Sequence, residues 1–326
     1  MSRLPSSLLC LLVSAAIFSS LKIEPSQQAP ARPRVRSKLS IYDLKDASTR
    51  VIYTADKLFE APNWSPDGKF LLINSDGNLY RVPVNGPKRE PERIDLGGIT
   101  GCNNDHGISP DGKMIVFSAR FNAPGSQVYL ANADGSNARL MTPKTPSYYH
   151  GWSPDGKWLA YVGRRNGNFD VYRMSTEGGE EQRLTTHPGL DDGPDYSPDG
   201  KWIYVNSNRT GNFDIWRFPA GGAGPGDKLA EQATSDEWED WFPHPSPDGK
   251  WMVFVSFEKG TQGHPANRHV QLRMMPLPGN KLQSAPIRVL SKLFGGQGTI
   301  NVNSWSPDSK RFAFVSYELV PSDAAR

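Results

Sequence analysis

The sequence predicts an all-β protein, a six-bladed β-propeller with four strands in each blade. A short motif, Ser-Pro-Asp followed by Gly or Ser, occurs six times, and its serines are 44, 44, 44, 49 and 60 residues apart. A period in this range, built from short strands, is typical of propellers. Apolar residues follow each motif, as in residues 157–162, and indicate a strand. The motif serines are Ser65, Ser109, Ser153, Ser197, Ser246 and Ser306.

The motif itself predicts a type I turn between two strands. Serine suits the first position, proline presets φ at the second, aspartate tolerates the third, and glycine closes the fourth. In the third repeat, residues 168–174 then predict another strand, Glu177-Gly178-Gly179 a turn, and residues 181–185 a fourth strand. Each repeat therefore forms one blade.

The two ends of the repeat region complete each other. Residues 39–53 have the pattern of the outer two strands of a blade, but no motif turn precedes them. Residues 302–316 supply an inner pair, and no outer pair follows. We therefore expect the last blade to be closed two-plus-two by the N- and C-terminal segments, which removes an exposed strand edge. The propeller is predicted over residues 37–318, with residues 319–326 as a tail.

These repeats resemble those of TolB-like six-bladed β-propellers over about residues 37–318. The resemblance implies the fold and a place in the bacterial envelope. It says less about activity, because propellers host many unrelated functions.

The N-terminal segment suggests export. Residues 8–18 form an apolar run behind Arg3, too short to span a bilayer comfortably but suited to a secretory signal. An uncleaved anchor and a buried apolar segment are the alternatives. We expect residues 1–20 to be a signal peptide or anchor and residues 21–36 a disordered leader. The protein is then periplasmic or secreted, with no transmembrane domain beyond this signal.

Composition limits the partners. The net charge is +3, and residues 1–36 hold five basic residues and one acidic residue, so the remainder is close to neutral. A nucleic-acid surface is not expected. Cys102 is the only cysteine after the apolar run, so no internal disulfide is predicted and a buried apolar role is favoured. We expect a monomer that binds an envelope protein or a small molecule.

The topology places all six histidines on the face opposite the motif turns. His106 and His150 stand three residues before their motif serines, and His244 stands two before its own. These three are the predicted ligands of a divalent metal, with Mn, Ca and Zn as candidates. The alternative is three separately hydrogen-bonded histidines in a polar funnel.

Other residues of this face are candidate site residues. The long loop at 260–269 is expected to fold over the funnel and bring His264 and Arg268 inward. The catalytic candidates are His106, His150, His264 and Arg268. The predicted ligand-binding residues are Asn104, Asp105, Tyr149, Asp192, Glu239, Trp241, Gln297 and Asn301.

Two functions are compatible with these residues. The first is non-catalytic binding of a partner protein or a small ligand, such as a carbohydrate, on the funnel face. The second is a propeller enzyme that resembles oligogalacturonate lyases. That resemblance implies a histidine-bound metal that neutralises a uronate carboxylate, and a nearby His or Arg that takes the proton. The sequence does not decide between them.

Overall fold

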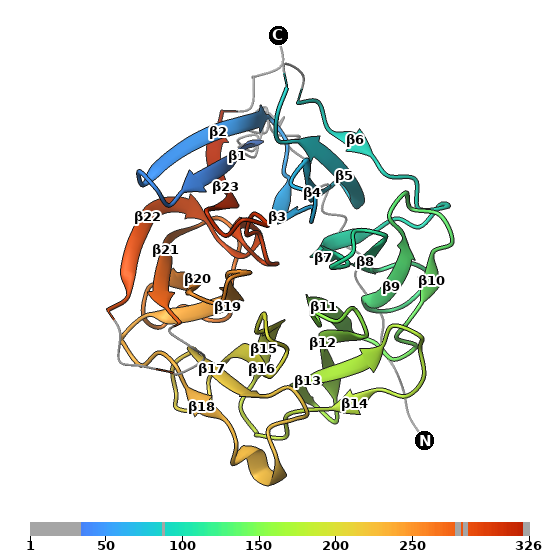
Figure 1. The fold of residues 1–326 in the computed structure, drawn as a ribbon, viewed down its shortest axis with the longest axis vertical. Coiled ribbons are helices and arrows are strands. Elements are labelled where there is room, and N and C mark those ends of the chain that lie inside the picture. The colour runs from blue at the N-terminus through green and yellow to red at the C-terminus, as the bar shows by residue number, and fades with distance from the viewer. Residues whose placement is uncertain (1–33, 87–88, 278–281, 283–285, 322–326) are drawn as a thin grey trace, which may run out of the picture.

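Six blades form a closed ring around a central channel, as predicted (Figure 1). The computed structural model describes residues 34–86, 89–277, 282 and 286–321. In this part of the chain the only helices are two short 3-10 turns, Pro225–Asp227 (η1) and Gln297–Thr299 (η3). No helix among these residues is long and apolar enough to cross a membrane. The predicted signal, most of the leader and the end of the tail lie outside the described residues.

Five blades are each built from four consecutive antiparallel strands. Their bounds, blade by blade, are β3 (Glu60–Trp64), β4 (Phe70–Ser75), β5 (Asn78–Pro83) and β6 (Glu92–Arg93); β7 (Cys102–Ile108), β8 (Met114–Ala119), β9 (Gln127–Asn132) and β10 (Arg139–Leu140); β11 (Ser147–Trp152), β12 (Trp158–Arg165), β13 (Asn168–Ser175) and β14 (Gln182–Arg183); β15 (Asp191–Tyr196), β16 (Trp202–Ser207), β17 (Asp214–Pro219) and β18 (Glu231–Gln232); β19 (Glu239–Pro245), β20 (Trp251–Phe257), β21 (Arg268–Pro276) and β22 (Arg288–Gly295).

The motif forms the predicted turn between the first two strands of each blade. In the third repeat, the Gly156 N–H donates to the Ser153 carbonyl at 2.9 Å. The Ser153 hydroxyl donates to Asp155 at 2.6 Å and accepts the N–H of Trp158 at 2.8 Å. Gly156 has φ of 75°, a left-handed value that favours glycine. The serine therefore ties the turn to the strand that follows it.

The sixth blade is closed by both ends of the chain, as predicted. β1 (Arg34–Asp43) pairs with β23 (Arg311–Val320) over ten residues, and β2 (Ser48–Ala55) lies outside β1. In place of a regular innermost strand, this blade has a single β-bridge between Trp305 and Phe312. The pairing extends beyond the predicted limits. Residues 34–36, assigned to the leader, and 319–320, assigned to the tail, are strand because each finds a partner across β1 and β23.

The innermost strands of the other five blades share an irregularity. Each shows a register shift against its neighbour shortly before the motif serine, such as between Cys102 and His106 in β7. A β-bulge of this kind bends the strand and re-aims its side chains. The bulges therefore decide which side chains face the channel.

The core lies between neighbouring blades. Leu72, Phe117 and Tyr129, for example, pack together across the first two repeats. Cys102 belongs to this cluster, which confirms its predicted role as a buried apolar residue.

Candidate ligand-binding site

A cavity of ≈ 250 Å³ opens on the face opposite the motif turns. Its walls come from β7, β11, β12, β13, β15 and β19, from the long loop before β21 and from the segment at η3. The lining residues are Asn103, Asp105, Tyr148, His150, Val162, Phe169, Leu190, Asp192, Phe242, His264, Gln297 and Asn301.

The bulges supply the central side chains of the cavity. Asp105 lies inside the bulge of β7, His150 inside that of β11 and Phe242 inside that of β19. Asp192 is the last regularly paired residue before the bulge of β15. If the side chains of each strand alternated regularly between its two faces, some of these side chains would lie between the blades. The irregular backbone brings them together instead.

The polar groups form one connected network. The His150 Nε2 lies 3.2 Å from one oxygen of Asp192, and the His264 Nε2 lies 3.4 Å from the other. The amide of Asn301 donates to Asp105 at 2.6 Å. Asp105 is also 3.9 Å from the His150 Nε2, so His150 stands between the two carboxylates.

Burial and pairing have opposite effects on these groups. Burial raises the pKa of Asp105, and the charge of His150 and the Asn301 hydrogen bond only partly oppose it. Burial alone would also raise the pKa of Asp192, but hydrogen bonds from His150 and His264 hold it well below its usual value. For His150, burial lowers the pKa, and the hydrogen bond and charge of Asp192 outweigh that effect and raise it. Asp192 and His150 thus favour their charged forms.

Aromatic rings complete the wall. Tyr148 and Phe169 lie side by side with ring centroids 6.4 Å apart. Phe242 stacks on His150 at 5.9 Å and meets the edge of His264 at 5.2 Å. The long loop thus folds over the funnel as expected and places His264 on the lining.

The three predicted metal ligands have different surroundings. His244 is buried and bonded to Asp195 at 3.1 Å and to the Ile300 carbonyl at 2.6 Å. His106 lines a second cavity of ≈ 440 Å³ at the opposite mouth of the channel, which the prolines of all six motif turns surround. Only His150 lines both cavities. Among the described residues, no group of three or more His, Cys, Asp or Glu could hold a metal ion. The metal site stays a prediction.

Several other predicted residues lie away from the lining. Trp241 is 1% exposed and belongs to the core, beneath the ring of His264. Glu239 is buried and accepts the backbone N–H groups of Phe213 and Gly260. Tyr149 packs in the core and faces the second cavity, and Arg268 is exposed at the start of β21. Each was chosen by its position in the sequence, but its side chain points elsewhere.

The remaining predicted residues lie at or near the cavity. Asp105, Asp192, Gln297 and Asn301 line it. Asn104 lies directly behind the wall, where its carbonyl accepts the Asn301 amide at 3.1 Å and its side chain lies 3.4 Å from the Gln297 amide.

The sequence analysis missed four apolar residues of the lining: Val162, Phe169, Leu190 and Phe242. One signal could have found Phe242. It stands four residues before its motif serine, the same register as Asp105 in the second repeat.

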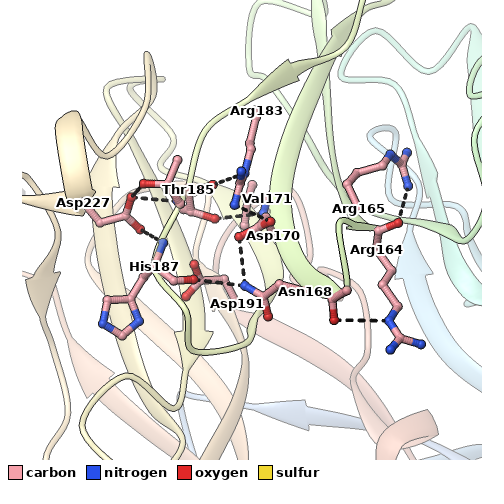
Figure 2. A network of polar contacts seen from close by, with 12 residues as sticks. Arg164, Arg165, Asn168, Asp170, Val171, Arg183, Thr185, His187, Asp191 and Asp227 are labelled. Atoms are coloured by element: carbon pink, nitrogen blue, oxygen red, sulfur yellow. Dashed lines mark hydrogen bonds and ion pairs between the residues drawn. The ribbon is translucent and has the colours of Figure 1, made fainter.

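Several basic residues near this face are paired with carboxylates. Between the third and fourth blades, Arg183 binds Asp170 at 2.8 Å, and the His187 N–H donates to Asp227 at 3.3 Å (Figure 2). Arg209 joins this network through Asp191 at 2.8 Å. Among the described residues, no Lys or Arg lines the cavity.

Comparison with known proteins agrees with this architecture. A family model described as the TolB beta propeller domain matches residues 149–277. An uncharacterized protein of Agrobacterium fabrum is 47% identical over 283 residues, which cover 87% of this chain and 93% of the relative. The chain belongs to the TolB-like β-propeller family.

Solved structures show the same likeness. One from Agrobacterium tumefaciens, provisionally described as TolB, is 47% identical, with a TM-score of 0.82 over 88% of this chain and 99% of that one. TolB from Acinetobacter baumannii has a TM-score of 0.60 and 19% identity over 80% of this chain. The chain covers 64% of that protein, and at this identity the likeness concerns the fold alone.

Proposed function

We propose that this TolB-like propeller is a binding protein of the bacterial envelope, and that the cavity on its funnel face receives a small ligand or a side chain of a partner protein. One observation carries the proposal. Polar groups of Asp105, His150, Asp192 and His264, the first two of them buried, converge on a cavity whose other lining residues are mostly aromatic and aliphatic. An apolar pocket with a few convergent polar groups is the usual form of a ligand site.

The lyase alternative has less support. Two carboxylates and no Lys or Arg line the described part of the cavity, so the positive charge that neutralises a uronate carboxylate would have to come from His150 or from the predicted metal. Like charges in a buried site repel strongly. The catalytic roles of His106, His150, His264 and Arg268 stay predictions that no contact favours.

Binding can be tested with a ligand panel. Neutral sugars, uronates, amines and divalent cations are titrated into the purified full chain by calorimetry. The titration of any compound that binds is then repeated with the Tyr148→Ala variant. We expect this variant to weaken binding at least about fivefold, because it removes a ring from the wall. Tyr80→Ala, a partly buried tyrosine on β5, is the matched control. No hit in the panel, or an equal effect of both variants, would contradict the proposal.

The envelope location rests on the family and on the apolar run after Arg3. Fractionation of the native host tests it. Recovery of the chain with a cytoplasmic marker would refute export.

A further inference from the structure

The cavity has a negative formal charge. Asp105 and Asp192 contribute two carboxylates, and no Lys or Arg stands among the described lining residues to balance them. With both carboxylates ionised, the charge of the four groups is −2 when both imidazoles are neutral and −1 when His150, whose pKa is raised, is protonated. A cation beside Asp105 favours its ionised form, which burial alone disfavours. A buried charge of this size favours a cation over a neutral molecule of the same shape.

One buried acceptor on the lining has no donor. The amide nitrogen of Asn301 donates to Asp105 and to the Asn104 carbonyl, which leaves its Oδ1 without a partner. Asn301 is fully buried. Buried acceptors without donors cost free energy that an N–H donor on a ligand recovers.

The apolar part of the wall suits the same ligand. The rings of Tyr148, Phe169 and Phe242 line the cavity beside the carboxylates. The face of an aromatic ring attracts a cation, and its body packs against methylene groups. Charge, a hydrogen-bond acceptor and aromatic faces therefore all select one chemical group.

We propose that this cavity binds a primary ammonium group carried on a short alkyl segment, as in a small organic amine or a lysine side chain. The proposal rests on the proposed binding function and names its ligand class. The ammonium lies beside Asp105 and Asp192, next to the His150 ring that separates them, and donates to Asn301 Oδ1. The alkyl segment lies along Tyr148 and Phe169.

The first test needs no variant. Butylammonium, 1-butanol and butanoate have similar alkyl chains and differ in charge, and each is titrated into the full chain by calorimetry. We expect butylammonium to bind at least about tenfold more tightly than either of the others. Choline, which has the charge but no ammonium N–H, is expected to bind more weakly than butylammonium. If choline binds as tightly, the role of the Asn301 acceptor is overturned.

A variant then tests whether Asp105 supplies the negative charge that binds the ammonium group. Asp105→Asn is expected to weaken butylammonium binding about tenfold or more. Glu177→Gln, which removes one exposed carboxylate from a turn of the third blade, is expected to leave it unchanged. A thermal melt shows whether Asp105→Asn folds, and if it does not, the comparison of the three probes decides.

The possible outcomes distinguish the ammonium inference from the proposed binding function. If 1-butanol or butanoate binds as tightly as butylammonium and Tyr148→Ala weakens that binding, the cavity is a ligand site and the ammonium inference is wrong. If no probe and no member of the wider panel binds, both are wrong.

Discussion

The imidazole of His106 is buried and has no hydrogen-bond partner among the described residues. The residue is 0% exposed. Burial lowers its pKa from 6.5 to about 3. The folded chain therefore keeps this ring neutral under conditions in which the unfolded chain protonates it.

This makes the free energy of unfolding depend on pH. The contribution of His106 is fully present above pH 6.5 and is lost as the pH falls from there toward about 3. The loss approaches about 1.4 kcal/mol per pH unit. In His106→Gln we expect this part of the slope to be absent. Urea denaturation between about pH 4 and 7 measures it.

His269→Gln is the control, because His269 is exposed on β21. It should keep the parent slope. If all three proteins lose stability equally with acid, His106 is not the group that titrates.

For individual residues, the sequence predicted the position along the strand better than the direction of the side chain. The register relative to the motif serine correctly brought Asp105 and His150 to one funnel face. The same reasoning failed for Trp241 and Tyr149, which pack in the core. Whether a side chain near a bulge turns to the channel or between the blades depends on backbone geometry that residue spacing does not encode.

Among the elements, the long loop between β20 and β21 depends on one buried carboxylate. Glu239, the first residue of β19, accepts the N–H of Gly260 at 3.0 Å and that of Phe213 at 2.8 Å. It thus fixes the loop that carries His264 to the preceding blade. Glu239 was predicted to contact the ligand, and the structure gives it a supporting position.

We expect Glu239→Gln to lower the free energy of unfolding by about 1–3 kcal/mol, because an amide cannot accept both N–H groups equally well. Hydrogen exchange at residues 258–264 should become faster. Glu258→Gln, at an exposed position of the same loop, should change neither quantity. Unchanged exchange in Glu239→Gln would show that the loop is held by other contacts.

For the whole molecule, the decisive feature is the pairing of the two ends. Arg34 lies opposite Val320, and ten residues of β1 pair with β23. This closure followed from the sequence because the repeats showed which strands were missing at each end. Its exact limits did not, since residues 34–36 and 319–320 become strand only through their partners across the sheet.

Circular permutation tests how much this closure contributes. One permutant joins the old ends with a short linker and opens the chain between β2 and β3. Every blade is then continuous, and no strand pairing links the two new ends. We expect it to fold but to unfold at a lower urea concentration than the parent, because only packing between blades closes its ring.

A second permutant is the matched control. It carries the same linker but opens at Asn166-Gly167, the hairpin between β12 and β13. Its third blade is again two-plus-two, so it should be the more stable of the two permutants. Equal urea midpoints would show that the paired ends contribute nothing beyond an ordinary blade.

The bulges before the motif turns have a consequence for how such a protein changes over evolutionary time. They occur at similar positions in five blades, one in each innermost strand. Duplicated repeats thus offer several equivalent positions at the rim of the channel, which are occupied here by residues as different as Asp105, His150 and Phe242. Because the bulged residues lie outside the regular strand pairing, substitution there can change the side chains at the rim while the ladders that hold the ring stay intact.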